Sequence, residues 1–249
     1  MRLVHFLRDS AVVVALTASL ATTASGQVLH DNGPAVIGGL SVLRPGAAIF
    51  GVGMQTDVPN AVADDFTVAV AGGWNVTGFS FFGYQTGGVN GAFTFTGLSW
   101  SIVAGDVNTG SVVQSGSVVP TNGGLVGYRV SGTDQGSTTR AIFQIDADVP
   151  DFVLGMGQYW LQWSMTGTGI SGPWQTSTAD GVEGNAHQSL DGTDFALRLD
   201  DLDGLSMEYP FIIRGTAAST VVPEPSTWSM MIVGGLAMVA FSRRRRRID

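Results

Sequence analysis

Hydrophobic and polar residues alternate with a period of two through the middle of the chain. Apolar side chains occupy alternate positions between Phe93 and Ile102, with a break at Gly97, and again in 141–145 and 159–165. This period is typical of strands with one buried face, whereas an amphipathic helix repeats every 3.6 residues. Because no amphipathic helix of useful length is found there, the pattern predicts an all-β domain.

Glycine-rich turns separate these segments from further predicted strands. The turns include 71–73 (AGG), 87–91 (GGVNG) and 121–124 (TNGG). The further predicted strands are 49–54, 66–70, 74–84, 111–119, 125–130, 195–199 and 211–214. Ten or more short strands with such turns predict an antiparallel β-sandwich, either jelly-roll or immunoglobulin-like. Its core is expected to contain Trp74, Val76, Phe79 and Phe81.

The N-terminal residues 1–26 have the composition of an export signal. Arg2 and Arg8 lie near the start, an apolar run covers 11–21, and small residues at 24–26 precede Gln27. The apolar run is shorter than the ~20 residues that a spanning helix needs, so we predict a cleaved signal peptide. An uncleaved membrane anchor is the alternative. The predicted β-sandwich domain then covers 27–215, followed by a spacer at 216–221.

The body of the chain is acidic and contains no cysteine. Residues 27–222 hold five arginines against seventeen Asp and Glu residues, a formal charge of −12. Nucleic acid is therefore not an expected partner, since its phosphates require clustered basic residues. The domain is expected to be held together by its core rather than by disulfides.

The C-terminal residues 222–249 contain three parts in a fixed order. Val222, Pro223, Glu224 and Pro225 form an extended motif, because the two prolines prevent helix formation. A single hydrophobic helix is predicted at about 228–242, and the cluster Arg243, Arg244, Arg245, Arg246 and Arg247 follows it. By the positive-inside rule, this cluster stays in the cytoplasm and leaves the body of the chain outside.

These three parts resemble the PEP-CTERM sorting tail of exported bacterial proteins. The resemblance implies export machinery and an exosortase as partners, with transient or retained contact with the inner membrane. It also implies delivery to the cell envelope or the exterior, and an association with exopolysaccharide and biofilm. A C-terminal membrane anchor without processing is the alternative. The run at 63–84 (ADDF, GWNV, FSFFGY) is also similar to segments of secreted bacterial β-sandwich proteins.

Several carboxylates lie near one another in the sequence, but they form no complete catalytic or metal-binding motif. Asp200, Asp201 and Asp203 surround a turn and are candidate calcium ligands, because calcium prefers hard oxygen donors. The glutamate that closes a standard calcium loop is missing, so solvated turn residues are the alternative. Two of these carboxylates could also serve as a glycosidase pair. Motifs for nucleophilic or zinc chemistry are lacking. Residues 167–172 (GTGISG) match the dinucleotide-binding glycine pattern, but Pro173 follows instead of a helix, so we interpret them as a turn. We expect no catalytic residues and no enzyme activity.

Two classes of function are consistent with the sequence. The first is a non-catalytic envelope or matrix protein that associates with polysaccharide or with itself. The second is a lectin-like module, with or without calcium, in which Trp160, Trp174 or Tyr84 would stack on sugar rings. Exposed aromatic rings would favour the second class, and buried tryptophans would favour the first.

Overall fold

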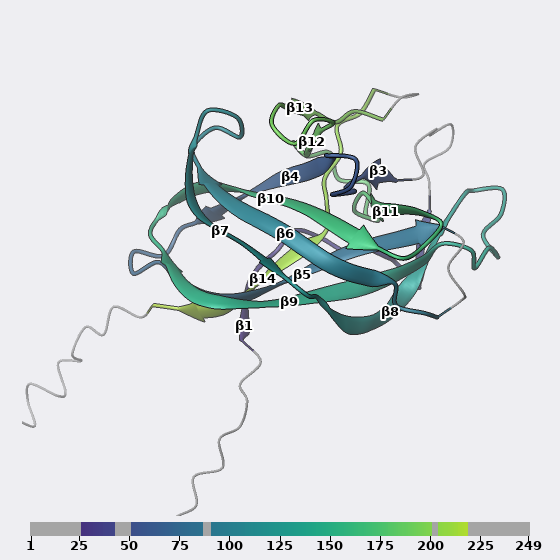
Figure 1. Cartoon of the computed structure of the whole chain (residues 1–249), viewed down its shortest axis with the longest axis horizontal. Helices are drawn as coiled ribbons and strands as arrows, with labels where there is room; N and C mark the ends of the chain where they lie inside the picture. Colours follow the sequence, from purple (N-terminus) through teal and green to yellow (C-terminus); the bar gives the residue numbers. More distant parts are fainter. Residues whose placement is uncertain (1–25, 43–50, 87–90, 201–203, 219–249) are drawn as a thin grey trace, which may run out of the picture.

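The described part of the chain folds entirely into strands, turns and loops. The computed structural model describes residues 26–42, 51–86, 91–200 and 204–218 (Figure 1). Within these ranges there is no helix, which confirms the prediction of an all-β domain. Fourteen strands form two sheets that share one hydrophobic core, a sandwich-like arrangement. The choice between jelly-roll and immunoglobulin-like topology stays a prediction.

The first sheet, sheet A, has the strand order β1-β14-β5-β9-β8-β2, and β11 and β3 extend it beside β5. Its pairs are antiparallel except for β2 with β8, which are parallel. The strands are β1 Gln27–Asp31, β2 Leu40–Val42, β3 Val52–Gly53, β5 Trp74–Thr86, β8 Thr121–Val130, β9 Ala141–Leu154, β11 Ser171–Gln175 and β14 Phe211–Ala217.

The second sheet, sheet B, has the strand order β13-β12-β4-β10-β6-β7, and all its pairs are antiparallel. Its strands are β4 Ala61–Val68, β6 Phe95–Ala104, β7 Ser111–Val118, β10 Gly157–Gly167, β12 His187–Ser189 and β13 Phe195–Leu197. The β4–β5 and β9–β10 connections both cross between the sheets. They close the same end of the molecule, because Val68 pairs with Gly157 and Trp74 pairs with Leu154.

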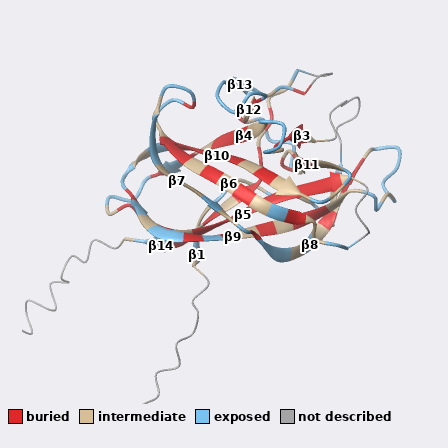
Figure 2. Cartoon of the chain, in the orientation of Figure 1, coloured by how far each residue is buried: buried red, intermediate tan, exposed pale blue. Residues whose placement is uncertain are grey.

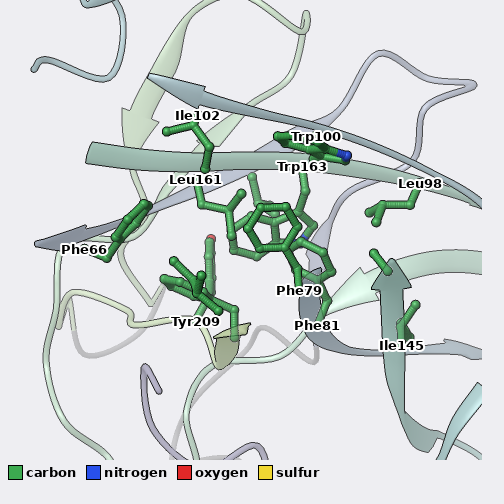
Figure 3. Close-up of a cluster of buried hydrophobic side chains, with 14 of the residues drawn as sticks. Phe66, Phe79, Phe81, Leu98, Trp100, Ile102, Ile145, Leu161, Trp163 and Tyr209 are labelled. Atoms are coloured by element: carbon green, nitrogen blue, oxygen red, sulfur yellow. The ribbon is translucent and has the colours of Figure 1, made fainter. Parts of the chain in front are cut away.

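Aromatic side chains from both sheets fill the space between them (Figure 3). Phe81 of β5 packs against Trp163 of β10 with ring centroids 5.1 Å apart, and Phe79 packs against Trp100 of β6 at the same distance. The Trp163 indole donates a hydrogen bond of 3.1 Å to Gln175, so its polar atom is satisfied inside the core. Figure 2 shows the buried residues in red along the facing strands. The predicted core residues Trp74, Val76, Phe79 and Phe81 are all buried, as expected.

A second, smaller hydrophobic cluster lies on the outer face of sheet A. It is built from Ala35, Phe82, Tyr84 and Ile142. After Gly78, the side chains of Phe79 and Phe81 lie in the core, and those of Phe82 and Tyr84 lie on the outer face. Strand β5 therefore buries apolar side chains on both of its faces. The segment after β1 covers this cluster, and Trp174 of β11 packs against it.

Some strand boundaries differ from the predicted ones. Residues 121–124 were expected to be a turn, but Thr121 pairs with Asp146 and Asn122 with Ile145, so they begin β8. Pairing with the long strand β9 overrides the turn preference of this Asn-Gly-Gly sequence. Strand β14 runs to Ala217, two residues into the predicted spacer. The strands β1, β2, β11 and β12 were not predicted.

The predicted signal peptide and the predicted C-terminal helix lie outside the described residues, apart from Gly26. Within the described ranges, no helix has the length and apolar character needed to cross a bilayer.

The first and last strands of the described chain pair with each other (Figure 1). Gln27 pairs with Gly215 in the antiparallel β1–β14 ladder. The contact is tight at Gly26, where a Cβ atom would lie 2.8 Å from the Gly215 nitrogen and 2.8 Å from the Thr77 hydroxyl. The two ends of the domain therefore leave the same edge of sheet A.

Removal of a central aromatic ring should strongly destabilise the domain. We expect Phe81→Ala to lower the free energy of unfolding by about 3–5 kcal/mol, because the ring is fully buried and its loss leaves a cavity. Urea titration monitored by tryptophan fluorescence measures this difference. Ile170→Ala is the matched control, since that side chain is 86% exposed and should change stability by less than about 0.5 kcal/mol. Equal effects of the two variants would contradict the assigned core.

Candidate functional site

The predicted calcium ligands are only partly within the described residues. Asp200 is buried, and its backbone nitrogen donates to the Leu205 carbonyl at 2.9 Å. Asp201 and Asp203 lie outside the described residues. Elsewhere in the described ranges, no group of three or more His, Cys, Asp or Glu residues is arranged to hold a metal ion. Calcium binding at 200–203 therefore stays a prediction.

The structure buries two of the three predicted sugar-stacking residues. Tyr84 is 1% exposed in the cluster on the outer face of sheet A, and Trp160 is 8% exposed. Trp160 points to the outer face of sheet B, but Phe195 of β13 packs into the same cluster and the His187 ring contacts it edge-on at 4.8 Å. These two rings present no open face to a sugar, which corrects that expectation. Trp174 is half-buried.

Three neighbouring strands of sheet B present hydroxyl and amide groups instead of charges on their outer face. Strands β6, β7 and β10 are neighbours in this sheet and contain no Asp, Glu, Lys, Arg or His. Their outward side chains are bonded to one another across the strands: Ser99 to Ser117 at 3.0 Å, Ser101 to Gln162 at 2.9 Å, and Thr96 to Thr166 at 3.1 Å. We call this set, together with Ser164, the neutral face. A depression of about 170 Å³ is lined by Ser99, Ser101, Gln162 and Ser164, among others.

The outer face of sheet A has the opposite character. A groove of about 930 Å³ is lined by Asp146, Asp148, Asp151 and Arg214, among others. The Ser80 hydroxyl donates to Asp146 at 2.6 Å, and the Arg214 Nε donates to Ser80 at 3.1 Å. We call this feature the acidic groove. Gly26, Gln27 and Thr216 also line it, so it lies where the two ends of the domain leave sheet A.

A buried carboxylate ties three segments together between the sheets. Asp64 of β4 faces the core and is fully buried. Its Oδ2 accepts hydrogen bonds from the Tyr209 backbone nitrogen at 2.7 Å and the Asn32 amide at 3.2 Å, while Oδ1 accepts from the Asp65 nitrogen at 2.9 Å. Burial raises the pKa of Asp64 well above its ordinary value, the charge of Glu208 raises it further, and the backbone donors oppose the shift. This arrangement makes Asp64 a structural anchor. From the sequence alone, the run Asp64-Asp65-Phe66 indicated only a similarity to secreted bacterial β-sandwich proteins.

The raised pKa of Asp64 should appear in the pH dependence of stability. Because the fold disfavours the charged form, we expect the stability that depends on Asp64 to be highest below about pH 4 and to fall as the pH rises toward the shifted pKa. Thermal melts of the wild type and Asp64→Asn between pH 4 and pH 7 measure this, and the fall should be weaker in the variant.

Asp191 provides a control of opposite sign for that experiment. The backbone N–H groups of Asp194 and Thr193 bond to its carboxylate and lower its pKa, so its contribution is present at neutral pH and is lost on acidification. Asp191→Asn should therefore not weaken the fall in stability between pH 4 and pH 7. If Asp64→Asn and the wild type show the same dependence, the titration does not arise from Asp64.

Comparison with known proteins assigns the C-terminal segment. No curated protein matches the chain. Residues 221–247 match the family model of the PEP-CTERM protein-sorting motif. They include the Pro-Glu-Pro sequence and the five arginines identified in the sequence, and they begin four residues after the last residue of β14. This motif identifies the chain as an exosortase-sorted protein that is exported and associated with the cell envelope.

Proposed function

We propose that the domain is a non-catalytic structural protein of the cell envelope or extracellular matrix and that it associates with exopolysaccharide in a biofilm. The observation that carries the proposal is the PEP-CTERM motif, attached directly to a domain whose first and last strands pair. Burial of Trp74, Trp100, Trp160 and Trp163 supports the structural class, since these rings are used for packing.

The position of the motif supports display of an intact domain. Strand β14 ends at Ala217 and Pro223 follows six residues later, so the motif can lie at most ~20 Å from the strand. Cleavage near the motif would remove no described strand. Cleavage before Gln27 would likewise leave the whole of β1 in place.

The neutral face supports polysaccharide as the partner. Sugar hydroxyls can exchange hydrogen bonds with the Ser, Thr and Gln side chains of this face without desolvating a charge. The formal charge of −12 on the body would repel anionic polymers over much of the remaining surface. We therefore propose a neutral polysaccharide, with strands β6, β7 and β10 forming the contact.

A second candidate function is a lectin-like carbohydrate-binding module that uses the acidic groove. The volume of about 930 Å³ favours this candidate, because it is within the range of ligand-binding clefts. Asp148 and Asp151 would accept hydrogen bonds from sugar hydroxyls, and Arg214 would donate. Calcium at 200–203 would be an additional requirement in the calcium-dependent form of this candidate.

Polysaccharide binding should depend on the neutral face. We expect the full chain, purified in mild detergent, to bind an immobilised neutral glucan with and without EDTA. Ser164→Asp should weaken binding by about tenfold or more, because it introduces a charge into this face. Asp148→Asn changes the charge of the acidic groove and is the matched control.

The outcomes of the binding experiment separate the two candidates. Loss of binding in Asp148→Asn but not in Ser164→Asp would support the acidic groove and contradict the neutral face. Loss of binding in EDTA would support the calcium-dependent module. No binding to any neutral or acidic polysaccharide in a glycan array would contradict both candidates and leave only the structural role.

Processing should depend on the Pro-Glu-Pro sequence. We expect Pro223→Ala combined with Pro225→Ala to leave the precursor in the membrane fraction with its arginine cluster attached, because the segment would no longer be held extended. Intact mass measurement of the membrane and extracellular fractions tests this, with Ser219→Ala in the spacer as the control. Normal processing of the double variant would contradict the requirement for the two prolines.

A further inference from the structure

Strand β7 is the longest edge strand of the two sheets. It has eight residues and, among the described strands, pairs only with β6. The other terminal strands are shorter: β13 and β2 have three residues each, and β1 has five. An edge strand presents unpaired N–H and C=O groups that can pair with another chain, and short edges limit this risk. Among the terminal strands of the two described sheets, β7 presents such a surface over the greatest length.

The sequence of β7 lacks the charged residues and prolines that often prevent edge pairing. No charged residue occurs between Asp106 and Arg129, and the strand contains no proline. Val112 and Val113 are 61% and 45% exposed. A bulge in the β6–β7 ladder interrupts pairing at Val113, but Gln114 to Val118 pair with β6 in regular register.

Charge favours another copy of the chain as the partner at this edge. The acidic body makes two copies repel each other over most orientations. At β7 this repulsion is reduced, because β6 and β10 beside it are also uncharged. An antiparallel pair of identical strands is related by a two-fold axis, so one surface serves both molecules and the assembly closes as a dimer.

We propose that β7 pairs in antiparallel fashion with β7 of a second copy and joins the two B sheets into one continuous sheet. The dimer interface then consists of backbone hydrogen bonds along 114–118, with the exposed side chains Ser115 and Ser117 beside the axis. The pairing also places the two neutral faces on one side of the joined sheet. This inference deepens the proposed structural role and rests on it, because self-association is one way in which such a protein builds a matrix.

Single cysteines test the pairing directly, since the chain contains none of its own. Ser115→Cys, Ser117→Cys and the double variant introduce thiols on the outer face near the proposed axis. Ile170→Cys is the control, because its side chain is 86% exposed and lies in the β10–β11 connection rather than on β7. The full chain is purified in mild detergent, oxidised with copper phenanthroline and separated on a non-reducing gel.

We expect at least one β7 variant to form disulfide-linked dimers on the order of fivefold more than Ile170→Cys, because paired strands hold the Cβ atoms within disulfide range. The register follows from which variant reacts best. If all the β7 variants form no more dimer than Ile170→Cys, the proposed interface is wrong.

A lysine at the edge should separate the two copies. Ser115→Lys places like charges close together across the axis, and we expect the dissociation constant of the dimer to rise by at least about tenfold in analytical ultracentrifugation. Ile170→Lys makes the same charge change and should leave the dimer intact. A Ser115→Lys chain that sediments as the wild type does would overturn the proposal, and cysteine cross-linking decides the question if this variant does not fold.

Failure of this inference can be distinguished from failure of the proposed function. A monomeric protein that is found in the envelope and binds neutral glucan would contradict β7 pairing and leave the proposed function standing. A dimer that binds no polysaccharide would support β7 pairing and contradict the polysaccharide role.

Discussion

The hydrogen bonds to the buried carboxylate of Asp64 hold together the segments on which the rest of the structure depends. Asp64 lies inside the core on β4, while Asn32 follows β1 and Tyr209 precedes β14. An unpaired carboxylate in such a position would be costly, and the three nitrogen donors offset part of that cost. The same contacts fix the approach of β1 and β14 to each other. The anchor in the core thereby holds the end of the β1–β14 ladder where Asp31 pairs with Ile212.

The two outer faces of the sandwich-like domain differ because different segments cover them. Ala35 and Val36, together with Trp174, cover part of sheet A, and the rest of that face carries Asp146, Asp148 and Asp151 in the acidic groove. On sheet B, β12 and β13 cover only the region near Trp160, which leaves the hydroxyl groups of β6, β7 and β10 accessible. The part of sheet B formed by β6, β7 and β10 therefore lacks charge, and the proposed polysaccharide and dimer contacts both use it.

The period-two pattern predicted the strands that bury one face in the shared core, such as those that carry Phe143, Ile145, Leu161 and Trp163. Alternation of apolar and polar residues indicates burial on one face. It could not predict Tyr84 and Trp160 correctly. Their burial depends on residues distant in sequence: Ala35 and Val36 for Tyr84, and His187 and Phe195 for Trp160. Turn residues at 121–124 became strand for the same reason, since pairing with β9 is a tertiary effect. The sorting motif was fully predictable because its information is local and linear.

The β1–β14 ladder has a consequence for the order of folding during export. Gln27 at the start of the domain pairs with Gly215 near its end, so this contact can form only when almost the whole domain is available. Contacts so far apart in sequence are slow to form, because a large loop must close first. A chain threaded through a membrane from its N-terminus would keep an unpaired first strand until the last one emerged. Completion of the sheet would then coincide with arrival of the sorting motif at the membrane, which couples maturation of the domain to its processing.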